Sequence, residues 1–267
     1  MDIERLRKII EFSDCNRSEI DAQIRQFYAF AGMNRDKDVI NIMQIVRMSF
    51  EKKGYLVLEI PFADQEIGAL CYKGDALGYV VLNTSLPKIN VNFALCHELF
   101  HVLYQKNEVK TKVEFAKDHY YEDKEEFAAN VFAGMLLMPE ESFCFMYKKF
   151  REDSDGNRKD TLIRLMNYYQ APYMAVLIRS LELRLLEEGT ALQELLEVNV
   201  HEIRERFVEL WLDESILNAS KRDDFLHIEA VVKRFGMEYV QEEYLNERTL
   251  KRVLQNMRQL YDEIKEK

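Results

Sequence analysis

The pattern of apolar and polar positions divides the chain into a helical start, a short stretch of strands and a long helical remainder. Residues 1–53 carry apolar side chains at helical spacing, and Gly54 suits the position just beyond a helix. Three segments rich in β-formers follow at 55–60, 67–72 and 78–83, with brief connections between them. These strands predict a small antiparallel sheet.

Helical periodicity returns after the strands and continues to the end of the chain. Pro172 and Gly189 suit the first position of a helix and the position beyond its last residue. The tail, 190–267, reads as helix, with breaks near 213–224 and around Gly236. The pattern therefore predicts the α+β class, mostly helical, with further helices at 91–104, 123–137, 140–150, 159–169 and 172–188.

Composition and charge narrow the class of protein. Apolar residues make up 48% of the 267 positions, which is too much for an intrinsically disordered chain. No apolar run approaches the roughly 18 to 20 residues that a membrane span needs, and the charged segment 1–8 does not resemble a signal peptide. We therefore expect a cytoplasmic protein without membrane contact. The net charge of −10 argues against direct nucleic-acid binding, which needs a basic face.

Residues 97–101 read His-Glu-Leu-Phe-His, the pattern HExxH. On a helix, His97 and His101 project from one face, so both imidazoles can bind one metal ion. Glu98 is rotated one residue step around the helix, which places its carboxylate beside the ion's open position rather than on the ion. A chain of this composition would contain the pattern by chance roughly 0.01 times. Since the flanking residues are apolar, we expect a buried metal-binding helix rather than two solvated histidines.

A catalytic zinc ion needs a third protein ligand, and no third histidine follows at close range. Glu125 and Glu126 are the candidates, and we favour Glu126 because it shares a helix face with Asn130. One of these two can bind the metal while the other holds a histidine through its second ring nitrogen. Zn²⁺ is the expected ion, although a His₂Glu site also takes Mn²⁺, Fe²⁺ or Co²⁺.

These residues resemble the ImmA/IrrE family of metallopeptidases. The resemblance covers roughly residues 38–188 and rests on HExxH, on the segment from Glu126 to Ala133 and on residues 136–139, Leu-Leu-Met-Pro. It implies a zincin-like peptidase core in the gluzincin style, with His97, His101 and Glu126 as ligands and Glu98 as general base. The known targets of such proteins are DNA-binding repressors, so the resemblance implies a repressor as the protein substrate.

Combined with the polar, turn-rich segment 151–158, the resemblance predicts three parts. They are a core with N-terminal helices at 1–150, a small helical subdomain at 151–188 and a helical C-terminal extension at 189–267. The segment from Lys159 to Glu188 has a helix-turn-helix outline, but its balanced charge favours packing over DNA contact. A donor to the transition state could come from His119, Tyr120 or Tyr121, which lie between the two ligand-bearing segments.

The tail leaves two interpretations open. It carries one apolar stripe from Leu192 to Trp211 and a second from Leu250 to Ile264. Both stripes can pack on the core, or they can form a surface for a partner or for a homodimer. A second function follows from the partner interpretation: a non-proteolytic, metal-binding anti-repressor that sequesters its target.

Overall fold

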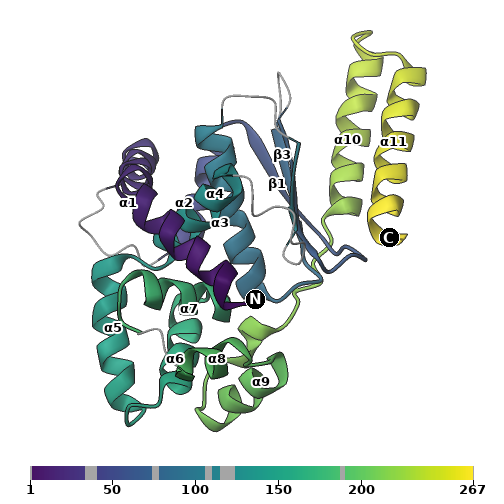
Figure 1. Cartoon of the computed structure of the whole chain (residues 1–267). Coiled ribbons are helices and arrows are strands. Elements are labelled where there is room, and N and C mark those ends of the chain that lie inside the picture. The colour runs from purple at the N-terminus through teal and green to yellow at the C-terminus, as the bar shows by residue number, and fades with distance from the viewer. Residues whose placement is uncertain are drawn as a thin grey trace.

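The computed structural model describes residues 2–33, 41–73, 78–105, 110–114, 124–186 and 190–266. Helices surround one four-stranded sheet, which confirms the α+β class with a mostly helical chain (Figure 1). The elements are α1 (Ile3–Ala31), α2 (Ile42–Lys52), β1 (Tyr55–Ile60), β2 (Ile67–Lys73), β3 (Gly78–Asn83), α3 (Lys88–Tyr104), β4 (Lys110–Glu114), α4 (Lys124–Leu137), α5 (Glu140–Asp153), α6 (Arg158–Tyr169), α7 (Tyr173–Glu182), α8 (Thr190–Leu196), α9 (Val200–Glu209), the short 3-10 helix η2 (Glu214–Leu217), α10 (Phe225–Gln241) and α11 (Glu247–Glu266).

The sheet is mixed, so the expectation of a wholly antiparallel sheet was wrong. Its order is β1-β3-β2-β4, with β1 and β3 parallel and the other two pairs antiparallel. Strand β3 lies between β1 and β2, so β1 and β2, although consecutive in sequence, are not neighbours in the sheet. Gly78 sits opposite Tyr55, and a Cβ there would lie 2.3 Å from the Tyr55 ring. The parallel pair therefore depends on a glycine at the start of β3.

One face of the sheet packs against α3, and this contact forms the middle of the main core. Alternate residues point to opposite faces of a strand. On the inner face, Cys71 of β2 and Val80 of β3 join Leu95 and Leu99 of α3 in one buried cluster. Helix α4 lies beside α3, and α1 covers α4, where the rings of Phe12 and Phe127 stack at 5.1 Å. The same cluster continues into α5, α6 and α7.

The first stripe of the tail packs on this core, except for Trp211 at its end, which is 94% exposed. Leu192 and Leu195 of α8 and Ile203 and Phe207 of α9 are all buried in the main cluster. The Arg206 guanidinium donates to both carboxylate oxygens of Asp160, at 2.9 and 2.6 Å, and so ties α9 to α6. Residues 190–217 are therefore part of the compact body and not a free extension.

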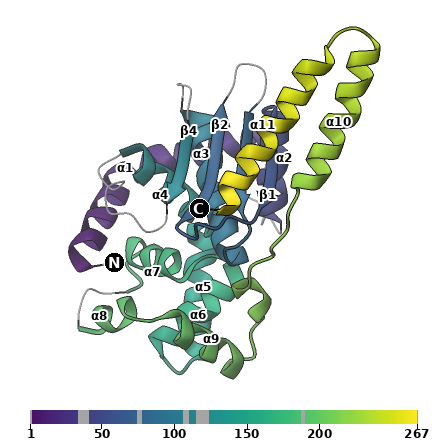
Figure 2. The same cartoon turned by 90° about the vertical axis from the view of Figure 1, so that its right-hand side faces the viewer.

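The second stripe behaves differently, because α10 and α11 form a hairpin on the side of the sheet opposite α3 (Figures 1 and 2). Met257, Tyr261 and Ile264 pack against a small outer cluster that includes Ile60 and Val81 of the sheet. Val253 and Leu260 of the same helix remain 40% and 55% exposed. The stripe thus divides between packing on the sheet and facing solvent.

Several predicted boundaries moved. Gly236 is not a break but lies inside α10, where a Cβ would come within 2.3 Å of the Leu250 side chain. The predicted helix at 172–188 ends at Glu182, two residues before Arg184 takes a positive φ of 56°. Gly189, its predicted cap, lies outside the described residues. The three-part division at 150 and 188 stays a prediction.

Among the described helices, none is both long and apolar enough to cross a membrane.

Candidate metal centre

Helix α3 brings the two histidines of the HExxH pattern together at the heart of the molecule. His97, Glu98 and His101 are 1%, 0% and 2% exposed. Because His97 and His101 are four residues apart, their rings lie on one face, and the two Nε2 atoms are 2.9 Å apart. This arrangement places two imidazole nitrogens where one ion could meet both.

Helix α4 supplies the carboxylate that faces these nitrogens. Glu126 Oε2 lies 3.1 Å from His97 Nε2, and Glu126 Oε1 lies 3.4 Å from His101 Nε2. The neighbouring Glu125 points elsewhere and accepts a hydrogen bond from the Gln105 amide. Of the two glutamates left open by the sequence, the structure therefore brings Glu126 to the histidines.

The three side chains fit a mononuclear metal ion. Their ligand atoms all lie within 4.8 Å of one another. Ligands held at about 2.0–2.1 Å around a tetrahedral Zn²⁺ stand about 3.3 Å apart. The distances here, 2.9, 3.1 and 3.4 Å, lie close to that separation. Two neutral imidazoles and one carboxylate also form a donor set that zinc peptidases use, with a fourth position open.

Asn130 holds the ring of His97 from the other side. Its Oδ1 lies 2.9 Å from His97 Nδ1, so the amide oxygen can accept the Nδ1–H. A hydrogen bond at this nitrogen fixes the ring and leaves Nε2 with its lone pair toward Glu126. Asn130 is one turn beyond Glu126 on α4, so the same helix face carries the carboxylate and the residue that orients His97.

Burial disfavours the charged form of each group in the cluster, and the neighbours decide the outcome. Burial lowers the pKa of His97, but the hydrogen bond and charge of Glu126 outweigh it, so the pKa is raised. For His101, burial and the charge of His97 lower the pKa to about 4. Burial raises the pKa of Glu126, but its bond to His97 and both histidine charges lower it overall. At neutral pH, Glu126 is therefore an anion and His101 a neutral ring.

Glu98 is positioned by the helix rather than by the cluster. It follows His97 on α3, is fully buried and lies close enough to contribute to the raised pKa of that histidine. Its role as general base rather than as a ligand stays a prediction. His119, Tyr120 and Tyr121, the predicted donors, lie outside the described residues.

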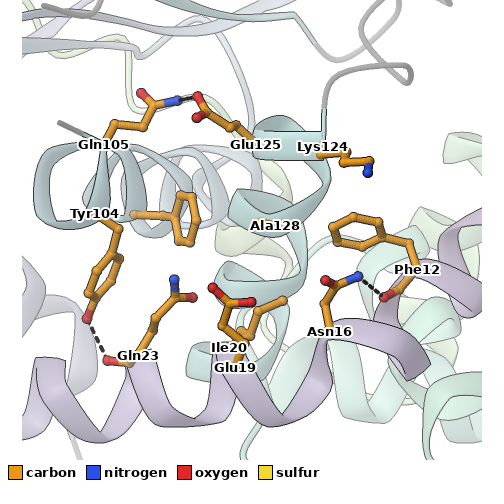
Figure 3. A pocket seen from close by; sticks show the side chains of 11 residues that line it. Phe12, Asn16, Glu19, Ile20, Gln23, Tyr104, Gln105, Lys124, Glu125 and Ala128 are labelled. Atoms are coloured by element: carbon orange, nitrogen blue, oxygen red, sulfur yellow. Dashed lines mark hydrogen bonds between the residues drawn. The ribbon is translucent and has the colours of Figure 1, made fainter. Parts of the chain in front are cut away.

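The sequence analysis missed Gln105, which is next to the centre. It is the last of three residues spaced by four on α3, after His97 and His101, and this spacing could have singled it out. Gln105 and Glu125 line a pocket of about 260 Å³ between α1, the end of α3 and the start of α4 (Figure 3). Figure 3 shows the Gln105 amide turned toward the Glu125 carboxylate.

A His-Glu-x-x-His helix facing a glutamate from a second helix, beside a small mixed sheet, defines the site as a metallopeptidase-type centre. A comparison with protein families agrees with a metallopeptidase-type centre. Residues 50–181 match the family model described as the IrrE N-terminal-like domain, a peptidase family. The predicted resemblance to the ImmA/IrrE family is confirmed. The comparison with curated proteins gave no match.

Proposed function

We propose that this chain is a zinc-dependent metalloendopeptidase of regulatory type. His97, His101 and Glu126 would hold the ion, and Glu98 would act as the general base. The observation that carries the proposal is the convergence of three ligand-type side chains in a chain that matches a peptidase family. Mn²⁺, Fe²⁺ and Co²⁺ also suit a His₂Glu set, so the identity of the ion is part of the proposal.

Each residue of the centre has a chemical task in this proposal. A zinc ion held there would supply Lewis-acid chemistry, which activates water and polarises a peptide carbonyl. Glu98 takes the proton of the attacking water and delivers it to the leaving amine nitrogen. Its burial beside His97 supports this role, because a proton held there is shielded from bulk water between the two transfers. Asn130 keeps His97 oriented during the reaction.

For the substrate, we propose a DNA-binding transcriptional repressor. The family resemblance is the main support. The net charge of −10 is a second, since a DNA-binding protein presents a basic surface that an acidic partner attracts. Peptide-bond hydrolysis in such a repressor would separate its domains and end repression.

The decisive experiment incubates the zinc-loaded chain with DNA-binding repressors from the same genome, with and without a chelator, and identifies products by mass spectrometry. Glu98→Gln should keep the metal and lose cleavage, because the amide cannot accept the proton. Glu19→Gln, an isosteric change at an exposed carboxylate on α1, is the matched control and should cleave normally. Cleavage by Glu98→Gln at the normal rate would remove Glu98 from the mechanism.

The α10–α11 hairpin supports the alternative function, a non-proteolytic anti-repressor. It exposes Leu226, Tyr239 and Tyr244 at 71%, 52% and 79%, and such a projecting element can bind a partner without chemistry. Relief of repression that is stoichiometric, insensitive to Glu98→Gln and free of cleavage products would favour sequestration over proteolysis.

A further inference from the structure

We propose that Gln105 is the positioning residue for His101, as Asn130 is for His97, and that Glu125 orients Gln105 for this task. The inference rests on the proposed metal-binding function and adds a residue to it. It would make the metal affinity of this chain depend on a side chain outside the HExxH pattern.

The first step concerns the two nitrogens of the His101 ring. Its Nε2 faces Glu126 and His97, so this atom would donate its lone pair to an ion. A neutral imidazole carries a single proton, which must then sit on Nδ1. His101 Nδ1 is buried and has no hydrogen-bond partner among the described residues. A buried N–H in this position needs an acceptor.

The second step concerns the Gln105 amide. Its Nε2 donates to a carboxylate oxygen of Glu125. An ionised carboxylate only accepts, so this bond fixes which end of the amide is nitrogen and turns Oε1 away from Glu125. Within the described part of the chain, Gln105 Oε1 is a buried acceptor with no hydrogen-bond partner. A donor and an acceptor that both lack partners thus belong to neighbouring side chains.

The third step is their proximity. Gln105 follows His101 by four residues, at the end of α3, and its backbone N–H bonds to the His101 carbonyl at 3.2 Å. Side chains at this spacing are neighbours on a helix. The proposed hydrogen bond runs from the Nδ1–H of His101 to Oε1 of Gln105.

The two histidines would then be held alike from opposite ends of the cluster. Asn130 on α4 accepts from Nδ1 of His97, and Gln105, the C-cap residue of α3, would accept from Nδ1 of His101. Glu125 would complete a chain of hydrogen bonds from His101 through Gln105 to the start of α4. These hydrogen bonds would give Glu125 a role in the metal centre even though its carboxylate does not face the histidines.

The test measures the zinc dissociation constant of the full chain by competition with a chelating indicator. Gln105→Met keeps the length of the side chain and removes the acceptor, so zinc binding should weaken about 10- to 100-fold. Gln105→Glu combined with Glu125→Gln keeps an acceptor for His101 and a hydrogen bond between the two side chains, so this double variant should retain affinity within a few fold. Gln23→Met, on the α1 side of the same pocket, is the matched control and should bind zinc as the unmodified chain does.

The outcomes separate the inference from the function on which it rests. Unchanged zinc affinity in Gln105→Met, with tight binding by the unmodified chain, overturns the role of Gln105 and leaves the metal centre intact. An unmodified chain that binds neither zinc nor another divalent ion overturns both.

A second measurement holds even if Gln105→Met fails to fold. Nitrogen NMR of the unmodified zinc-loaded chain should show His101 protonated at Nδ1, with a slowly exchanging, downfield proton. In the Gln105→Glu, Glu125→Gln double variant that proton should move further downfield, because a carboxylate is the stronger acceptor. An Nδ1 proton whose chemical shift is unchanged in the double variant would contradict the role of Gln105.

Discussion

Glu126 lies within 3.4 Å of the Nε2 atoms of both His97 and His101, whereas Glu125, one residue earlier on α4, turns to Gln105. One step along a helix rotates a side chain by about 100°. That single step separates a carboxylate that can share an ion with two histidines from one that cannot. The distinction leads directly to a pair of variants.

Glu126→Gln should abolish the stabilisation of the chain by zinc, whereas Glu125→Gln should preserve it, because its amide oxygen can still accept from Gln105. An ion that binds only the folded state raises its stability by about 2.7 kcal/mol at 100 times the Kd. The unmodified chain and Glu125→Gln should therefore melt at a higher temperature with zinc than without it, and Glu126→Gln should show no such difference. Equal zinc-dependent shifts in both variants would show that Glu126 is not a ligand.

Zinc affinity should rise with pH. Metal ligands must be deprotonated, and the pKa of His97 is raised, so binding releases a proton from this ring below its pKa. The apparent affinity should then fall by up to about tenfold for each pH unit below that value. His101, with its pKa lowered to about 4, should add nothing to this dependence near neutral pH. Calorimetry in buffers of different ionisation enthalpy counts the released protons, and a pH-independent affinity would contradict the assignment.

Asn130→Ala should weaken zinc binding about 10- to 100-fold, because it removes the acceptor that fixes the His97 ring. Asn130→Asp keeps an acceptor and should retain affinity. Chelator competition measures both. Comparable weakening in the two variants would indicate a packing role for Asn130 instead.

Two truncations should behave differently. A chain ending at Asp224 keeps α8 and α9 and should fold and bind zinc. A chain ending at Glu188 also loses the buried side chains of Leu192 and Phe207, and truncating a buried Phe costs about 3–5 kcal/mol. We expect the shorter chain to be insoluble, and a folded, zinc-binding product would show that α8 and α9 are dispensable.

Gly236→Ala should loosen the hairpin, because its Cβ would meet the Leu250 side chain. Overpacking of this kind costs about 1–3 kcal/mol. Gly134→Ala in α4 is the control: a Cβ there meets nothing within 4 Å, so the better helix former should stabilise that helix by about 0.5–1 kcal/mol. Hydrogen exchange of the α10 and α11 amides measures the effect, and unchanged protection in Gly236→Ala would show that the helices can separate without cost.

Local rules were enough to predict the metal-binding face and the helices around it. The positions of His97, His101 and Asn130 follow from spacing along two helices, and spacing is readable from sequence. The preference for Glu126 over Glu125 used the same rule and agrees with the geometry. Helices α3 and α4 are held together by packing. The apolar residues flanking both segments indicated this contact, but they do not predict the distance between the two helices.

Non-local pairing was beyond reach of the same rules. Nothing in residues 55–83 states that β3 enters the sheet between β1 and β2, since pairing partners are chosen by the whole fold. Strand β4 was missed because Lys110–Glu114 is polar and short, as edge strands often are. Gly236 led to the prediction of a helix break that does not exist. A glycine is typical of a break, but here it allows α10 and α11 to approach closely.

Both ends of the α10–α11 hairpin are fastened to one short stretch of the sheet edge. The Asp224 amide donates to the Glu59 carbonyl at 2.9 Å, and the Ala63 amide donates to the Ile264 carbonyl at 3.0 Å. The intervening residues therefore leave the body and return to it at nearly the same place. A segment with this geometry is a natural cassette, which could be exchanged between related chains, or replaced by a short loop, to transfer partner choice without rebuilding the metal centre.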